Sequence, residues 1–437
     1  MVGQATVFAS FLAAALPLAS VGGAARAAEQ LAPVTIRGKV PVDEKAAAAS
    51  EGLVPAEQIE ARPTQRPADL LEAVPGLVVT QHSGDGKANQ YFLRGFNLDH
   101  GTDVSIYALG MPVNQRTHAH GQGYADLNWL IPELVDSVAW RKGPYLARDG
   151  DFATAGAVEI DYVDRLDHPF ALVGIGSHGW RRVLTAGSWP IGLKPGQRAA
   201  DSDGRLLIAA EIVGYDGPWT VPENLRKQNL FMRYSEGSAE RGWCLSAVAY
   251  QARWTATDQI PERAVAAGQL GRFDSLDSTT GGKTDLTALV WNARGDNRAG
   301  PWRANAYVSG YGLDLYSNFT YALDAAHGDQ FRQFDRRTRW GADASQTWRW
   351  QAFGAAQSTT VGSQLRQDRI GALRLQLTDR REVYDTVRSD KVRETSIGVF
   401  IDQATQWTPW ISSRAGLRAD RFDFDVRADQ IENSGTA

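Results

Sequence analysis

From about residue 168 onward the sequence alternates apolar and polar residues over long segments, and this pattern constrains the fold more than any other feature. Leu230, Met232 and Tyr234, for example, alternate with residues that include Asn229 and Arg233. Successive side chains of a β-strand point to opposite faces, so the pattern predicts strands with one apolar and one polar face. The same alternation recurs at 206–213, 285–290 and 396–401.

The connections between these segments are sorted by length. Short connections are expected at 237–241, 295–300, 351–352 and 408–409. Long, charged connections are expected at 258–282, 320–329 and 368–391, with 191–204 as an exception to the pattern. Bacterial membrane barrels have short turns on one side and long loops on the other, whereas a soluble β-sandwich would not sort its loops in this way. We therefore predict a membrane β-barrel wall, with roughly eleven antiparallel strands between Pro169 and Val426.

The amino-acid composition agrees with a membrane barrel and does not favour a nucleic-acid-binding protein. The chain holds 14 Trp, 13 Tyr, 15 Phe and 43 Gly, and aromatic residues accumulate where barrel strands cross the membrane surface. A net charge of −4 gives no support for nucleic-acid binding. The single cysteine, Cys244, cannot form an intramolecular disulfide, and we expect it to pack in the wall.

The N-terminus reads as an export signal. An apolar run at 5–18 is followed by Ala25-Arg26-Ala27, which fits an A-x-A cleavage site. The alternative is a buried N-terminal helix. We expect residues 1–27 to be a signal peptide and residues 28–66 to be a flexible lead rich in alanine, proline and charge.

Three phrases between residues 69 and 162 carry a family resemblance. They are Asp69-Leu70-Leu71-Glu72-Ala73-Val74-Pro75-Gly76-Leu77, Phe92-Leu93-Arg94-Gly95-Phe96 and Trp140-Arg141-Lys142-Gly143-Pro144. In this order they resemble the plug domain of TonB-dependent outer-membrane receptors. The resemblance implies an α/β plug at 67–165 inside a barrel at 166–437. Receptors of this kind have twenty-two strands, so the chain is expected to be truncated, with about 11 of them.

The resemblance also implies partners and an energy source. A short β-prone segment sits where these receptors carry a TonB box: Pro33, Val34, Thr35, Ile36, Arg37 and Gly38. Such a box adds as a strand to the periplasmic domain of TonB, although six residues also fit an ordinary linker. We expect the protein to import a scarce ligand, most readily a siderophore-iron or other metal chelate. The receptor would contact outer-membrane lipid, and its plug and N-terminus would be accessible from the periplasm. The alternatives are a passive pore without energy coupling and a sensory receptor, which would need a further N-terminal domain.

Within the plug we expect a short helix at 67–73 and strands at 77–81, 91–94, 104–107, 137–140 and 157–162. Helical turns are expected at 126–134, broken by Pro132. The resemblance implies that Arg94, beside Gly95, locks the plug to acidic residues of the wall. We find no catalytic constellation and expect neither an enzyme nor a bound cofactor.

Four of the seven histidines lie in the plug, and two of them, His118 and His120, are two residues apart. On an extended segment such a pair points to one face, and neutral imidazole suits Zn²⁺, Cu²⁺ or Fe. The resemblance places this segment where the plug faces its ligand. The candidate ligand residues are Arg116, His118, His120, Gln122 and Tyr124. Three interpretations stay open for the histidines: hydrogen bonds to the wall, ligand contact without a metal, and a metal site completed by Asp99, His100 or Asp103.

Overall fold

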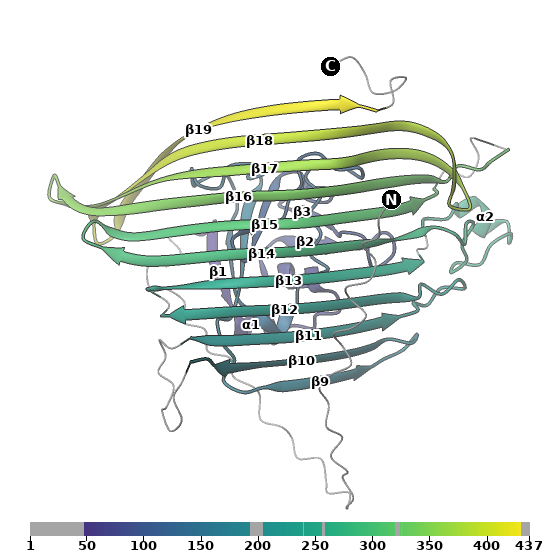
Figure 1. Ribbon diagram of the computed structural model, residues 1–437, viewed down its shortest axis with the longest axis horizontal. Coiled ribbons are helices and arrows are strands. Elements are labelled where there is room, and N and C mark those ends of the chain that lie inside the picture. Colours follow the sequence, from purple (N-terminus) through teal and green to yellow (C-terminus); the bar gives the residue numbers. More distant parts are fainter. Residues whose placement is uncertain are drawn as a thin grey trace, which may run out of the picture. The chain divides into compact units, whose positions relative to one another are not determined.

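Eleven antiparallel strands form one sheet in which every strand pairs with its neighbours in the sequence (Figure 1). The structure is a computed structural model that describes residues 48–192, 204–238, 240–255, 258–319, 324 and 326–429. The strands are β9 (Phe170–Ile175), β10 (Arg181–Pro190), β11 (Arg205–Tyr215), β12 (Leu225–Gly237), β13 (Gly242–Thr255), β14 (Gly281–Asn297), β15 (Gly300–Ser317), β16 (Phe331–Ala352), β17 (Ala355–Asp379), β18 (Glu382–Thr408) and β19 (Ile411–Ala428). The predicted number of strands and their antiparallel order are confirmed.

The alternating pattern places polar side chains on the inner face of the wall. In β12, Asn229, Arg233 and Ser235 are buried, whereas Leu230 and Met232 are exposed on the other face. The predicted strand alternation is therefore confirmed, with the apolar residues facing outward. In the part of the chain that the structure describes, no helix has the length and apolarity needed to cross a membrane.

Residues 48–167 form a smaller α/β region with two sheets. One sheet has the order β1-β7-β8-β5-β6, in which β5 and β8 run parallel, and the other has the order β2-β3-β4. The elements are β1 (Glu51–Pro55), α1 (Ala56–Glu60), η1 (Pro67–Ala73), β2 (Leu77–Thr80), β3 (Gln90–Leu93), β4 (Phe96–Asn97), β5 (Val104–Ala108), β6 (Met111–Pro112), η2 (Pro132–Leu134), β7 (Val135–Arg141) and β8 (Gly156–Tyr162). We call residues 48–167 the plug and β9–β19 the wall.

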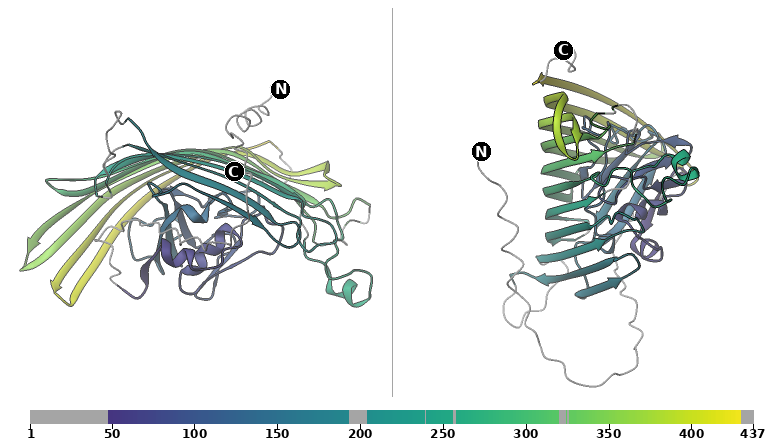
Figure 2. Two further views of the ribbon diagram at one scale, coloured as in Figure 1. Left: turned by 90° about the horizontal axis from the view of Figure 1, so that it is seen from below. Right: turned by 90° about the vertical axis from the view of Figure 1, so that its right-hand side faces the viewer.

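The plug lies against the concave face of the wall (Figure 2). Buried plug residues such as Leu70, Ile106 and Leu130 belong to one apolar cluster with wall residues such as Leu286 and Leu313. Plug and wall share one compact unit, Ile36–Ala437. The core thus joins two regions whose strands belong to separate sheets.

Two expectations about the plug need correction. The segment 28–66 is not a flexible lead throughout, because β1 pairs with β7 along its whole length and α1 follows directly. The expected helical turns at 126–134 reduce to η2, which begins at Pro132 and is not broken there. Proline is tolerated in the first turn of a helix, where its missing N–H has no partner in any case.

One expected long connection is also wrong. Residues 368–391 are not a loop, because β17 continues to Asp379 and β18 begins at Glu382. Leu373, Leu375 and Leu377 keep alternating with polar residues, so the ladder extends beyond the usual span of a membrane strand. The turn consists of Arg380 and Arg381, whose φ angles are 47° and 72°. High charge in this segment had suggested a loop where the alternation indicates strands.

The other connections follow the prediction within the described residues. The long connection that contains α2 (Glu262–Ala266) lies at one end of the wall, and short turns such as 353–354 lie at the other. We call these the long-loop end and the short-turn end. The predicted signal peptide (1–27), the predicted TonB box (33–38) and most of the connection 191–204 lie outside the described residues.

Candidate ligand-binding site

The four plug histidines come together near the long-loop end of the wall. We call His82, His100, His118 and His120 the apex histidine cluster. His82 and His100 have ring centroids 5.3 Å apart, and those of His100 and His120 are 4.7 Å apart. His120 also contacts Gln333, close to the start of β16. The sequence singles out the pair at 118 and 120 and offers His100 as a residue that could complete a site, and the fold adds His82 from an earlier plug loop.

His100 and His120 face each other directly, with 3.0 Å between their Nε2 atoms. Nδ1 of His100 lies 2.9 Å from the carbonyl oxygen of Asn89, which can only accept a hydrogen bond. Nδ1 of His120 lies 2.8 Å from Oε1 of Gln333, whose amide nitrogen donates to the carbonyl of Ala119. Each Nδ1 therefore carries a proton, and in the neutral rings each Nε2 presents a lone pair to the other.

His118 is used differently. Its ring stacks on Tyr124, with centroids 4.1 Å apart, and its Nδ1 accepts a hydrogen bond from the backbone N–H of His120. The proton of the neutral ring consequently lies on Nε2, which is buried and 3.9 Å from Asp335. His118 and His120 therefore do not point lone pairs at one common position.

Burial favours the neutral form of these rings. Desolvation lowers the pKa values of His118 and His120 well below the ordinary histidine range. Nearby cations add to this effect, Arg337 for His118 and Lys87 for His120. The pKa of His100 is lowered by the same two causes, burial and Lys87. Neutral imidazole is the form that can coordinate a metal ion.

Among the other predicted ligand residues, Tyr124 packs against the apex histidine cluster, with its ring centroid 5.5 Å from that of His100 and 5.6 Å from that of His120. Tyr124 is fully buried and its hydroxyl accepts a hydrogen bond from the N–H of Ala88 at 2.9 Å, whereas Gln122 is exposed. Arg116 pairs with Asp151 at 2.6 Å and donates to Ser396 of β18 at 2.7 Å. This arginine is thus engaged between plug and wall and is not directed toward a ligand.

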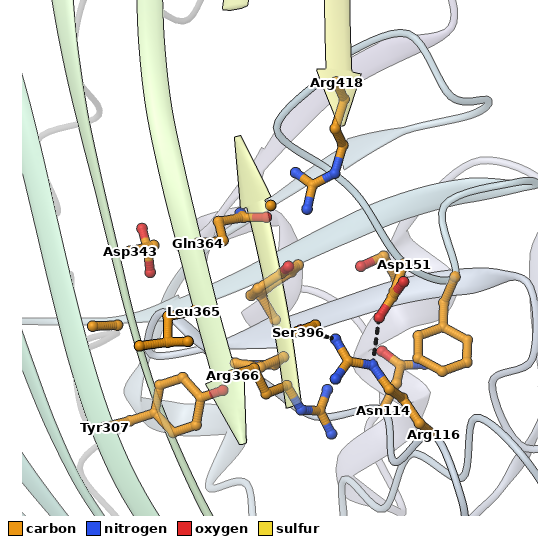
Figure 3. A pocket seen from close by; sticks show the side chains of 16 residues that line it. Asn114, Arg116, Asp151, Tyr307, Asp343, Gln364, Leu365, Arg366, Ser396 and Arg418 are labelled. Atoms are coloured by element: carbon orange, nitrogen blue, oxygen red, sulfur yellow. Dashed lines mark hydrogen bonds and ion pairs between the residues drawn. The ribbon is translucent and has the colours of Figure 1, made fainter. Parts of the chain in front are cut away.

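Arg116 lines a small cavity between plug and wall (Figure 3). The cavity measures about 50 Å³, which accommodates a few water molecules but not a chelate. Its guanidinium groups, from Arg116, Arg366 and Arg418, are all paired with aspartates. The cavity therefore belongs to the plug–wall interface.

Arg94 does not form the expected lock with the strands described here. It is exposed and has a φ angle of 53°, and its guanidinium donates to the carbonyl of Lys142 inside the plug. Gly95 beside it has a φ angle of 86°, a conformation that glycine adopts readily. The pair shapes the turn between β3 and β4.

The wall holds the plug through arginines that sequence reasoning missed. Arg233 donates to the carbonyls of Tyr162 and Val163 at 2.6 and 3.2 Å. Arg339 donates to the carbonyls of Pro112 and Val113, and Arg337 donates to that of Thr117. These arginines occupy inward-facing positions of strands in which apolar and polar residues alternate. That position is the sign of their role that the sequence offers. Their partners, backbone carbonyls far away in the sequence, have no sequence signal.

One bidentate ion pair reinforces this attachment. Arg182 of β10 binds both carboxylate oxygens of Glu133 in η2, at 2.5 and 2.8 Å. The same guanidinium lies 2.6 Å from Glu211, which in turn pairs with Lys227 at 2.9 Å. Plug and wall are therefore joined by charge-assisted hydrogen bonds, which are stronger than neutral ones.

The histidine cluster does not form a closed metal centre by itself. Within the described ranges, no group of three or more histidine, cysteine, aspartate or glutamate side chains is arranged to hold a metal ion. Any ion at His100 and His120 would keep coordination positions open for ligands of its own. An arrangement of this type suits a passing ligand better than a structural metal.

Comparison with known proteins gives a consistent result. Residues 43–157 match the family model of the TonB-dependent Receptor Plug Domain. Solved structures with the same fold include the ferric citrate transporter FecA in its unliganded form (TM-score 0.68, 12% identity, covering 87% of this chain and 57% of that one). The siderophore receptor PirA from Acinetobacter baumannii matches with a TM-score of 0.61 and 16% identity, over 87% of this chain and 58% of that one. The copper transporter OprC matches with a TM-score of 0.61 and 17% identity, over 87% and 59%. The chain thus spans less than two thirds of the length of these proteins.

Proposed function

Residues 43–157 of this chain belong to the TonB-dependent receptor plug family, and on that premise we propose that the protein imports a scarce ligand across the outer membrane with energy delivered through TonB. The matched fold of the wall supports an outer-membrane location. The ligand would bind at the long-loop end, over the apex histidine cluster. Pulling on the N-terminal segment would then rearrange the plug.

The attachment of the plug carries this proposal. The plug lies on the concave, polar face of the wall, and arginines of β12 and β16 hold its backbone carbonyls. Each hydrogen bond to a charged group contributes about 1.5–3 kcal/mol, so moving the plug requires breaking several such contacts together. A ligand can pass only if external work displaces part of this interface, and a transmitted proton gradient supplies such work.

The proposed coupling element is the segment Pro33 to Gly38, which is β-prone and precedes β1 closely in the sequence. It would pair as a strand with the periplasmic domain of TonB, where backbone hydrogen bonds provide the affinity. The cargos named for FecA, PirA and OprC are ferric citrate, siderophores and copper. We propose a metal ion or metal chelate as the cargo class here as well.

An uptake panel tests the proposal. A strain that lacks its own copy of this receptor is supplied with the full-length protein and grown on iron chelates, copper, zinc, cobalamin and oligosaccharides. We expect growth or accumulation on at least one metal-containing member, and loss of that uptake when TonB is deleted. Uptake that persists without TonB would instead support the passive-pore alternative.

A further inference from the structure

We propose that the facing imidazoles of His100 and His120 bind a first-row divalent cation, with Cu²⁺ preferred, as two neighbouring ligands supplied by the plug. The inference rests on the proposed function, because it names the cargo of the same site. It replaces the sequence-based pair His118 and His120 by a pair from two separate plug loops.

The lone pairs of the two rings point toward each other. Asn89 and Gln333 fix the proton of each ring on Nδ1, so both unprotonated Nε2 atoms face one another at 3.0 Å. Two lone pairs at this distance repel each other unless a cation lies between or beside them. Metal-ligating histidines characteristically donate their other ring N–H to a carbonyl or carboxylate, and both rings here do so to a carbonyl-type oxygen.

The separation of the two nitrogens matches neighbouring ligands of one ion. If each Nε2 lies about 2.0 Å from an ion, nitrogens 3.0 Å apart subtend about 97° at that ion. This angle is close to the right angle between neighbouring ligands in square-planar or tetragonal sites and smaller than the tetrahedral angle. Square or tetragonal nitrogen sites favour Cu²⁺ or Ni²⁺, and Cu²⁺ has the highest affinity of the divalent first-row ions.

The surroundings of the pair also favour a cation. His120 is partly exposed, so the pair is not completely sealed from solvent. Oδ1 of Asp99 lies 3.6 Å from Nε2 of His100, and its side chain is 48% exposed, which leaves it free to move toward a bound ion. The nearest cation, Lys87, is directed elsewhere, since its Nζ lies 3.0 Å from Nε2 of His82. The remaining positions would be occupied by ligands that the ion carries.

The test removes each Nε2 while keeping the hydrogen bond that orients the ring. In His100→Asn and His120→Asn, the side-chain amide can still donate to Asn89 O or Gln333 Oε1 but has no second nitrogen at the Nε2 position. The purified full-length protein is titrated with CuSO₄ and with ZnSO₄. We expect one tight Cu²⁺ site in the parent, weaker Zn²⁺ binding, and a loss of Cu²⁺ affinity in each variant at least as large as the roughly 10- to 100-fold that loss of a ligand's outer hydrogen-bond partner costs.

His82→Asn is the matched control, because its ring is a neighbour of the pair but its Nε2 faces Lys87. It should bind Cu²⁺ like the parent. Electron spin resonance of bound Cu²⁺ should show two imidazole nitrogens in the parent and one in either pair variant. Equal Cu²⁺ affinity in the parent and the His100→Asn variant, or bound Cu²⁺ without imidazole coupling, would overturn the assignment.

The Cu²⁺-binding experiment and the uptake experiment can fail independently of each other. If Cu²⁺ does not bind the pair but TonB-dependent uptake of another panel member occurs, only the metal inference fails. If Cu²⁺ binds as expected but no uptake depends on TonB, the proposed function fails and the site remains.

Discussion

At the scale of single residues, the plug is held by a few buried arginines of the wall. Arg233 is 4% exposed and donates to two plug carbonyls and to Ser246. A buried carbonyl that loses its donor bears the full cost of desolvation, so these contacts matter more than the exposed ion pairs at the strand ends. Inward-facing arginines are therefore the residues whose replacement should loosen the plug.

Replacing Arg233 by methionine tests this claim. Arg233→Met keeps much of the side-chain volume but leaves the carbonyls of Tyr162 and Val163 without their donor. We expect the free energy of unfolding to fall by about 2–4 kcal/mol, measured by thermal or denaturant unfolding in detergent. Arg226→Met, on the same strand but exposed, is the control and should be close to neutral. Equal effects of the two changes would contradict the role given to Arg233.

At the scale of elements, one contact joins the plug loop before β3 to the connection between β11 and β12. The N–H of Asp85 donates to Glu223, which is 2% exposed, at 2.5 Å. Arg66 pairs with Asp85 from the other side at 2.5 Å. Burial and the neighbouring charge of Asp85 raise the pKa of Glu223 to about 8. Ionisation of Glu223 therefore destabilises the folded protein through burial of the charge and repulsion from Asp85, although the Asp85 N–H itself favours the carboxylate.

This raised pKa predicts a pH dependence. Between pH 4.5, the ordinary carboxyl pKa, and about pH 8, the folded protein holds a proton on Glu223 that the unfolded chain has released. The contribution of Glu223 to the free energy of unfolding is therefore fully present below pH 4.5 and is lost as the pH rises toward about 8. Glu223→Gln keeps an oxygen acceptor without the charge. It should be more stable than the parent by about 1–2 kcal/mol at roughly pH 8.5 and equal to it near pH 5. Unfolding curves of the variant, the parent and the exposed-site control Glu236→Gln at both pH values check this. A constant difference across the range would refute it.

The helices and strands also show how much of the fold the sequence predicts. Strand alternation depends on neighbours two residues apart, and the eleven-strand order of the wall follows from it. η1 was predicted with its observed bounds, because a proline begins it and a Pro-Gly step follows it closely. β1 was missed because its pairing with β7 joins segments almost 90 residues apart, and its own sequence, EGLVP, has little alternation. Hydrogen bonds such as that between His120 and Gln333 join residues 213 positions apart and cannot be inferred from either segment alone.

In the candidate site too, the sequence predicts local spacing but not tertiary contacts. The spacing of His118 and His120 suggested a common face, but the backbone N–H of His120 occupies Nδ1 of His118. His100 was named only as a residue that could complete a site, and the fold makes it the direct partner of His120. Local spacing therefore pointed to this region of the plug, and tertiary contacts decide which nitrogen atoms face each other.

At the scale of the whole molecule, the account requires a plug that stays in the wall until work is applied to it. The long-loop end carries the apex histidine cluster, and the wall arginines fix the plug along its flank. The segment from Pro33 to Gly38 precedes the first plug strand and is the proposed point of attachment for TonB. Ligand binding and energy coupling should consequently depend on different parts of the chain.

The most direct measurement is therefore uptake by a full-length protein from which residues 33–38 have been deleted. Cells producing this variant are compared with cells producing the parent for surface binding and for accumulation of the metal species identified in the uptake panel. We predict unchanged surface binding together with loss of accumulation, because the ligand site is intact and the strand that pairs with TonB is missing. Accumulation at the parent's rate would contradict energy coupling through this segment.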